Sequence, residues 1–237
     1  MEKWQEELIH LHPDGTTALH TIFHAIEKAA YALEFDYVAY DYQAALPASK
    51  PHVTLINNYP EIWQKRYRQA GYLKQDPRLH RCIHTNRPVI WNDELFADAP
   101  ALWHDARQCG LCHGWSQPLP DVPAGAGVLS LVRPLQALTA RELNSKASQM
   151  QWLAHVTHTL LSHRIRHDHA AHIRQLTDRE IEVLKWTADG KSSQDIADIL
   201  KLSKNTVDFH IKNTVKKLNV PNKTAAVVQA LILGLIN

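Results

Sequence analysis

The chain has 237 residues, of which 45% are hydrophobic and 21% are charged. This balance is typical of a globular protein that buries a core, and it excludes a largely disordered chain. The formal net charge is only +2. From residue 174 to the end there are 10 Lys and Arg against 7 Asp and Glu, whereas the rest of the chain has 16 against 17. The surplus of positive charge near the C-terminus is a weak indication of nucleic-acid binding there.

The first residues, MEKWQEELIH, have no apolar core of the kind that marks a secretion signal, and no segment approaches the length of a membrane span. We therefore expect a cytoplasmic protein. Three cysteines are an odd number, which argues against a framework of disulfides.

Through residue 165, short apolar runs alternate with amphipathic segments. Pro13, Asp14 and Gly15 separate the first two helices, and Thr16 is positioned to cap the second. Helices are expected over residues 3–11, 17–33, 59–69, 77–84, 101–109 and 139–163. Strands are expected over residues 35–42, 53–56, 88–91, 114–119 and 127–132, with a loop over 120–125. This order predicts an α/β domain in which an antiparallel sheet is covered by helices on both faces.

The segment HRIRHDHAAHIRQ, residues 163–175, is polar and lacks an apolar stripe, so we expect a linker within it. The predicted domains are residues 1–165 and 174–237, with the linker over 166–173.

Four short helices and no strand are expected after the linker. Thr177 and Glu180 have the spacing of a capping box, and Gly190 closes that helix as a left-handed cap. Lys201 and Leu202 form a tight turn between the second and third helices. The residues that begin the last three helices are Ser192, Ser203 and Asn222. Two short helices joined by a tight turn indicate a helix-turn-helix.

The third of these helices has two distinct faces. Its buried stripe is expected to consist of Val207, Ile211, Val215 and Leu218. The opposite face carries Lys204, Asp208, Lys212 and Lys216, with Phe209 beside them. Lysines there would meet phosphates or guanine edges, and Phe209 could touch a thymine methyl group. The alternative is a solvated face on a structural helix, but the caps, the turn and the four helices together favour DNA binding.

Residues 176–223, LTDREIEVLKWTADGKSSQDIADILKLSKNTVDFHIKNTVKKLNVPNK, resemble the LuxR/FixJ-type helix-turn-helix. The resemblance implies that residues 202–218 form the recognition helix. The side chains that it then places at DNA are Lys204, Asn205, Thr206, Asp208, Phe209, Lys212 and Lys216. Position 208 often carries Lys or Asn in the family, whereas this chain has Asp. We expect Asp208 to tune sequence preference, since an acid can accept a hydrogen bond from a cytosine amino group.

The N-terminal domain is rich in aromatic residues. Tyr59, Trp63 and Tyr67 step by four and are expected to share one face of a helix. Such a face usually packs in a core, but each of these side chains also carries a polar group that needs a partner when buried. Asp76, just before Pro77, is a carboxylate beside apolar residues and also needs a donor. These facts alone give only modest support for a ligand pocket.

The segments NYPEIWQKRYRQAGYLKQDP, PVIWNDELF, GLCHGWSQPLP and GVLSLVR resemble the autoinducer-binding domain of LuxR-type quorum-sensing regulators. The six signature positions of that family are present as Trp63, Tyr67, Asp76, Pro77, Trp91 and Gly114. The ligand that the resemblance implies is an N-acyl-homoserine lactone.

The resemblance also assigns roles within the pocket. It implies that the Trp63 indole donates to the lactone carbonyl and that Asp76 accepts from the ligand amide. Tyr59 and Ser130 would hold the acyl carbonyl, while Tyr67 and Trp91 would wall the pocket. A buried amide needs one acceptor and its carbonyls need donors, so this set of residues is chemically suitable.

Two residues depart from the family pattern. Arg78 stands where a small or apolar residue is usual, and Asp41 stands where many relatives have Gly. If both face the acyl-chain region, they can form an ion pair that shortens the pocket or makes it polar. In the alternative, both point to solvent.

The predicted function is ligand-controlled binding of palindromic promoter DNA by a homodimer, without metal or cofactor. One alternative is a LuxR-type regulator that responds to a non-lactone molecule or acts without ligand. Another is an enzyme acting on a small amide or lactone, with Asp76 as base and Cys109 or Cys112 as nucleophile. The string Cys109-Gly110-Leu111-Cys112-His113 matches a haem attachment motif, but no export signal accompanies it. The histidines between residues 155 and 172 have no Cys or acidic partner at metal-ligand spacing.

Overall fold

The structure is a computed structural model that describes residues 2–12, 17–47, 51–170 and 175–236. Contacts between residues divide the chain into two compact units. The first unit comprises Met1–Asp121 and Gly125–Asp168, and the second comprises Val122–Ala124 and His169–Asn237. The expected cap at Thr16 and residues 171–173 of the expected linker lie outside the described residues.

The first unit is built on a five-stranded sheet whose order is β2-β1-β5-β4-β3. Every neighbouring pair of strands is antiparallel. The strands are β1 (Tyr37–Ala44), β2 (Val53–Asn57), β3 (Val89–Ile90), β4 (His113–Asp121) and β5 (Gly125–Arg133). The predicted 120–125 loop is shorter than expected, because β4 continues to Asp121 and β5 resumes at Gly125.

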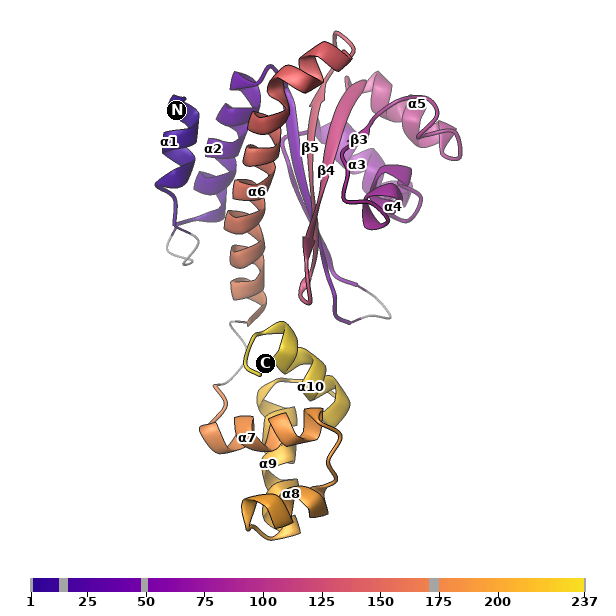
Figure 1. Cartoon of the computed structure of the whole chain (residues 1–237). Coiled ribbons are helices and arrows are strands. Elements are labelled where there is room, and N and C mark those ends of the chain that lie inside the picture. The colour runs from indigo at the N-terminus through magenta and orange to yellow at the C-terminus, as the bar shows by residue number, and fades with distance from the viewer. Residues whose placement is uncertain (1, 13–16, 48–50, 171–174, 237) are drawn as a thin grey trace. The chain divides into compact units, whose positions relative to one another are not determined.

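Helices cover both faces of this sheet, as the sequence predicted. Figure 1 shows α1 (Lys3–Ile9), α2 (Leu19–Ala32) and α6 (Ala140–Ala170) on one face. The opposite face carries α3 (Glu61–Gln69), α4 (Pro77–Ile83) and α5 (Pro100–Gln108), with the 3₁₀ turn η1 (Tyr72–Lys74) between α3 and α4.

Alternation along β1 separates two cores. Val38, Tyr40 and Tyr42 are buried in the core that includes α2 and α6. Ala39 is buried in the other core, together with aromatic residues of α3 and α5. Because successive side chains of a strand point to opposite faces, Asp41 lies on the same side as Ala39. The sheet therefore directs Asp41 toward α3, α4 and α5.

Helix α6 is longer than the sequence predicted. We expected it to end at His163, but it continues to Ala170, so residues 166–170 of the expected linker are helical. Ile165 lies one turn after Leu161 and both are buried in the same core. The guanidinium of Arg166 also donates to both oxygens of Asp121, at 2.6 and 2.7 Å. These tertiary contacts stabilise two further turns of a polar segment.

The second unit consists of α7 (Asp178–Ala188), α8 (Ser193–Leu200), α9 (Lys204–Lys217) and α10 (Lys223–Ile232) among the described residues. The capping predictions are confirmed. Thr177 and Glu180 form a capping box at α7, and Ser192, Ser203 and Asn222 each accept a backbone N–H of the helix that they begin. Gly190 has a φ of +80° after α7, the left-handed conformation that glycine adopts without strain.

Gly114 on β4 lies against Trp91, and no side chain fits between them. A Cβ atom at this position would lie 2.3–2.7 Å from three carbons of the Trp91 indole, which is buried. We expect Gly114→Ala to destabilise the first unit by about 2–3 kcal/mol, the upper part of the range for overpacking. Urea unfolding followed by fluorescence measures this change.

The control is the same substitution in a Trp91→Leu background, where a smaller and more flexible side chain faces position 114. There Gly114→Ala should cost clearly less, which gives a measurable coupling energy between the two sites. Equal costs in both backgrounds would show that the clash with Trp91 is not the cause.

Candidate functional site

A cavity of about 90 Å³ lies between the sheet and the helices α3, α4 and α5. Its walls come from β1, β2, α3, the start of α4, the residue after β3, and α5. Arg68 and Leu55 carry it to the surface, since both side chains are exposed. The lining residues are Asp41, Leu55, Asn57, Tyr59, Trp63, Gln64, Tyr67, Arg68, Asp76, Arg78, Trp91, Phe96, Leu102 and Ala106.

The inner wall holds a buried cluster of three charged side chains. Arg78, Asp41 and Asp76 are only 5%, 6% and 3% exposed. Nη1 of Arg78 donates to Oδ2 of Asp41 at 2.5 Å, and Nη2 donates to Oδ2 of Asp76 at 3.0 Å. The ion pair that the sequence allowed is therefore present, and the alternative in which both residues point to solvent is wrong.

Asp76 and Pro77 explain how Arg78 reaches this position. Asp76 is the N-cap of α4, and its carboxylate accepts the backbone N–H of Arg78 at 3.0 Å. Pro77 occupies the first turn of the helix, where its missing N–H costs nothing. This local geometry turns the Arg78 side chain toward the sheet, where Asp41 meets it.

A chain of hydrogen bonds through two serine hydroxyls connects the Arg78 guanidinium to the Trp91 indole. Nη1 of Arg78 donates to Ser130 Oγ at 2.8 Å, and Ser130 is 2.8 Å from Ser116 Oγ. The Trp91 indole N–H donates to Ser116 Oγ at 2.8 Å. The guanidinium carbon lies 5.6 Å from the centre of a Trp91 ring, a favourable cation–π distance. The ring, the serines and the guanidinium therefore hold one another in place.

Tyr59 and Tyr67 both line the cavity, but only one of their hydroxyl groups has a hydrogen-bond partner among the described residues. The Tyr67 hydroxyl donates to Asp76 Oδ2 at 2.9 Å. The Tyr59 hydroxyl is buried and has no hydrogen-bond partner within the described residues. An unpaired buried hydroxyl is costly, so this one marks a place where a ligand atom would be stabilised.

Burial and charge set the protonation of the cluster. Burial raises the pKa of Asp41, although the neighbouring Arg78 opposes that change. Burial lowers the pKa of Arg78, but Asp41 and Asp76 outweigh it, so the net pKa lies well above its usual value. Burial also raises the pKa of Tyr59, which keeps its hydroxyl neutral and able to donate. Arg78 is therefore a cation that lies between the carboxyl groups of Asp41 and Asp76.

Seven of the eight side chains expected to contact ligand line the cavity, namely Asp41, Tyr59, Trp63, Tyr67, Asp76, Arg78 and Trp91. Ser130 does not line it and reaches the cavity only through its bond to Arg78. Their contacts with ligand stay a prediction.

Sequence reasoning missed seven lining residues, although periodicity contained a signal for most of them. Leu55 and Asn57 precede Tyr59 at steps of two, as on one face of a strand. Gln64 and Arg68 step by four beside Trp63 and Tyr67 on α3. The other three are Phe96 and, one turn apart on α5, Leu102 and Ala106.

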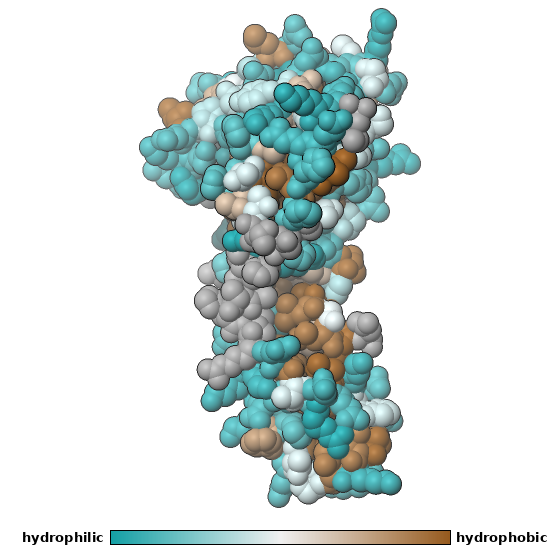
Figure 2. Space-filling model, turned by 90° about the vertical axis from the view of Figure 1, so that its left-hand side faces the viewer, coloured by the Kyte–Doolittle hydropathy of each residue, from teal (hydrophilic) through white to brown (hydrophobic). Residues whose placement is uncertain are grey.

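Helix α9 of the second unit presents the predicted charged face. Lys204, Asn205, Asp208, Lys212 and Lys216 are exposed, and Thr206 is half-buried. Phe209 is 59% exposed, which is unusual for a large aromatic side chain. On the opposite side Val207 and Leu218 are buried, while Ile211 and Val215 are half-buried. Figure 2 shows patches of hydrophobic residues on a surface that is mostly hydrophilic.

An ion pair between buried Glu180 and half-buried Lys217 holds α9 against α7. Glu180 is only 3% exposed, and its Oε2 accepts from Lys217 Nζ at 2.6 Å. The same carboxylate closes the capping box at Thr177. Lys217 is therefore engaged inside the unit, while the lysines on the other side of α9 are left to face outward.

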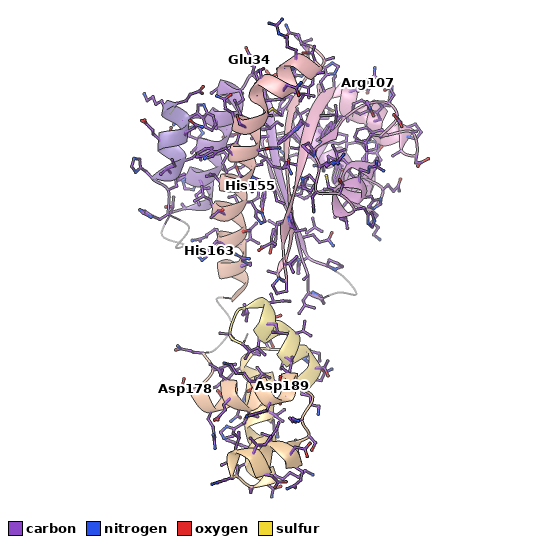
Figure 3. All side chains as sticks on the ribbon, viewed as in Figure 1. Glu34, Arg107, His155, His163, Asp178 and Asp189 are labelled. Carbon is purple, nitrogen blue, oxygen red and sulfur yellow. The ribbon has the colours of Figure 1, made fainter. Side chains whose placement is uncertain are left out.

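The described residues contain no group of three or more His, Cys, Asp or Glu that could hold a metal ion. His155 and His163 project from α6 (Figure 3), and both are exposed. The side chains of residues 167–174 lie outside the described part of the chain. Cys109 and Cys112 do not line the cavity beside Asp76. Among the described residues, no helix is both long and apolar enough to cross a membrane.

Two family models match the chain. The model described as "Autoinducer binding domain" matches residues 18–161. The model described as "Bacterial regulatory proteins, luxR family" matches residues 174–230.

Relatives of known function match along almost the whole chain. The chain is 35% identical to the transcriptional activator protein AnoR of Acinetobacter nosocomialis, over 100% of both chains. It is 35% identical to the HTH-type quorum-sensing regulator RhlR of Pseudomonas aeruginosa, over 91% of this chain and 89% of RhlR.

Solved structures of SdiA share the fold. A crystal structure of Escherichia coli SdiA has a TM-score of 0.82 and 33% identity, over 98% of this chain and 96% of SdiA. A structure of SdiA in complex with octanoyl-rac-glycerol has a TM-score of 0.81 and 32% identity, over 99% of this chain and 96% of SdiA.

Arg78 is expected to be essential for the stability of the first unit. Arg78→Met would leave Asp41 and Asp76 buried together without a counter-charge. Breaking a buried pair in this way costs about 3–5 kcal/mol. Urea unfolding of the purified variant would measure the loss.

Arg66→Met is the matched control. Arg66 also pairs with an aspartate, Asp105, at 2.6 Å, but its side chain is 56% exposed. Water screens such a pair, so its loss should change stability far less. Equal effects of the two substitutions would contradict the structural role assigned to the buried cluster.

Proposed function

Because the chain belongs to the LuxR family of quorum-sensing transcriptional regulators, we propose that its cavity binds an N-acyl-homoserine lactone and that a homodimer binds palindromic promoter DNA. The observation that carries the ligand proposal is the buried Tyr59 hydroxyl, which faces the cavity and has no partner among the described residues. Family membership also argues against the alternative of an amide- or lactone-hydrolysing enzyme, since the family consists of transcription regulators.

In the proposed complex, Tyr59 donates to the acyl carbonyl and Trp63 donates to the lactone carbonyl. Asp76 accepts from the ligand amide. Its Oδ1 accepts only the backbone N–H of Arg78 within the described residues, so a lone pair is left for that bond. Ser130 acts through Arg78, to which it is hydrogen-bonded. Tyr67 and Trp91 wall the site, and no group transfers a proton.

Ligand binding would control the regulator by mass action. A molecule that binds only the folded first unit stabilises that state in proportion to the logarithm of its concentration. The population able to dimerise and to bind DNA then rises. We propose α6 as the contact between the two copies. The proposed domains are residues 1–165 and 174–237, joined by residues 166–173, and the proposed location is the cytoplasm.

In the proposed DNA complex, α9 enters the major groove. Lys204, Lys212 and Lys216 would contact phosphates or guanine edges. Asn205 and Thr206, at the N-terminal end of the helix, would reach the first bases, and Phe209 would touch a thymine methyl group. A dimer would place two such helices in successive major grooves, which is why a palindromic site is proposed.

A second candidate is a regulator that responds to a non-lactone acyl molecule. The complex of SdiA with octanoyl-rac-glycerol favours it, because that relative shares the fold over almost the whole chain. The charged wall formed by Asp41 and Arg78 also differs from an apolar acyl site. Mass spectrometry of small molecules extracted from protein made in its native host would decide between the two candidates.

Tyr59→Phe tests the ligand site. The change removes an unpaired hydroxyl, so the ligand-free protein should keep its stability or gain slightly. Affinity for the acyl-homoserine lactone should fall about tenfold, which corresponds to one hydrogen bond of roughly 1.4 kcal/mol. Urea unfolding with and without ligand measures both quantities.

Tyr67→Phe is the control, because its hydroxyl already donates to Asp76. That variant should lose stability without ligand. If Tyr59→Phe instead destabilises the free protein and leaves the ligand affinity unchanged, the Tyr59 hydroxyl has a structural role and the ligand assignment is wrong.

Asp208→Asn tests the DNA interface. We expect it to change the ranking of affinities across a set of single-base operator variants, because Asp accepts from cytosine whereas Asn pairs with adenine. Fluorescence anisotropy with each duplex at fixed salt would measure the ranking. An unchanged ranking would refute the role of Asp208 in base preference.

Lys212→Met tests whether this lysine contacts a phosphate rather than a guanine edge, because a phosphate contact carries no sequence information. Affinity should fall uniformly across the duplexes, and the slope of log affinity against log salt should shrink by about 1. Lys65→Met removes the same charge from an exposed position on α3, and it should leave both quantities unchanged.

A further inference from the structure

We propose that the Asp41–Arg78 pair selects neutral acyl ligands that carry a hydroxyl or oxo oxygen on the first carbons beyond the amide carbonyl, and that it rejects plain chains of equal length. This inference depends on the proposed function, since it concerns the same cavity.

The position of the pair supports the proposal. Asp41 and Arg78 both line the cavity, and Arg78 Nη2 is 3.0 Å from Asp76 Oδ2. Asp76 is the proposed acceptor of the ligand amide. A group that reaches Arg78 must therefore lie within a few bonds of that amide, which places it at the start of the acyl chain.

The guanidinium has donors left for a ligand. Arginine carries five N–H groups in its side chain. Within the described residues, those of Arg78 make three hydrogen bonds, to Asp41, Ser130 and Asp76. Arg78 itself lines the cavity, in which the Tyr59 hydroxyl also has no partner among the described residues. Two oxygen atoms on one ligand, its acyl carbonyl and a second oxygen nearby, would satisfy both groups.

The charge of the cluster indicates that the ligand is neutral. Two carboxylates lie around one guanidinium, and all three side chains are almost fully buried. An anionic ligand would add a third negative group to the low-dielectric inner wall, where the buried guanidinium is already paired with two carboxylates, and the other arginine of the lining, Arg68, is exposed at the surface. Hydroxyl and oxo groups accept a hydrogen bond without adding charge.

A plain hydrocarbon chain meets the opposite situation. It would cover the open donors of Arg78 and remove them from water without supplying an acceptor. If the chain pushed Arg78 aside, Asp41 would be left buried without its partner. The network through Ser130, Ser116 and Trp91 also opposes that movement. Rejection by unpaired polar groups gives stronger discrimination than a change of pocket size.

An internal competition would test the proposal with the full chain. The protein is produced with an equimolar mixture of octanoyl- and 3-oxo-octanoyl-homoserine lactone, purified, and extracted for mass spectrometry. The ratio of bound ligands is then independent of whether the ligand-free chain folds. We expect the oxygenated ligand to exceed the plain one at least tenfold, and a ratio near or below one would overturn the proposal.

Two variants assign the preference to the pair. Asp41→Gly with Arg78→Val removes one negative and one positive charge, so the formal charge of the cluster is unchanged, and the ratio should fall below one. Arg78→Lys keeps the cation but loses the planar fork, and the ratio should drop at least threefold. If the double variant does not fold, the Arg78→Lys variant alone tests whether the pair causes the preference. An unchanged ratio in the variant that folds overturns the proposal.

Arg66→Val with Asp105→Gly is the matched control, because it removes an Arg–Asp pair outside the cavity. Its ratio should equal that of the unaltered chain. Recovery of both lactones at equal levels would overturn the selectivity but leave the proposed function standing. Recovery of neither lactone from the folded, DNA-competent chain would overturn both.

Discussion

The first unit depends on one buried interaction, the neutralisation of the Arg78 guanidinium by Asp41 and Asp76. These three side chains come from α4, from β1 and from the residue that caps α4. The guanidinium also bonds to Ser130 on β5 and lies over Trp91, which follows β3. An uncompensated charge in this place would be severely destabilising, so the helix and the strands are held in one arrangement. Further hydrogen bonds, from the Tyr67 hydroxyl to Asp76 and from Arg78 to Ser130, hold the same side chains in this arrangement.

Strand β1 connects this cavity to the other face of the sheet. Asp41 faces the cavity, while its neighbours Tyr40 and Tyr42 face α6. The Tyr40 hydroxyl is 2.8 Å from Nδ1 of His158 on α6. The Tyr42 hydroxyl donates to Asp121, which also holds Arg166 near the end of α6. A ligand that stabilises β1 would therefore stabilise the contacts of α6 as well, since both depend on the same strand. This arrangement suits a regulator in which α6 precedes the helix-turn-helix unit along the chain.

The second unit presents one face of α9 to its anionic partner, DNA. Side-chain caps begin all four of its described helices. The Glu180–Lys217 pair and the buried Val207 fix the rotation of α9 about its own axis. Because that rotation is fixed, the exposed lysines and Asp208 share one side, and Phe209 is displayed beside them. In the proposed complex, Asp208 on this basic face would give the chain its own base preference.

The sequence by itself determined the features that depend on near neighbours. Capping boxes act over three residues and amphipathic stripes over a few turns, so the four C-terminal helices and the two faces of α9 could be predicted. The family resemblance, together with the two departures from it, named seven of the fourteen residues that line the cavity. Only the tertiary structure decided whether Asp41 and Arg78, 37 residues apart, would meet or face solvent. It also decided that α6 continues to Ala170, through the burial of Ile165 and the bond between Arg166 and Asp121, 45 residues apart. These outcomes follow from strand register and from packing between distant segments, which no local pattern encodes.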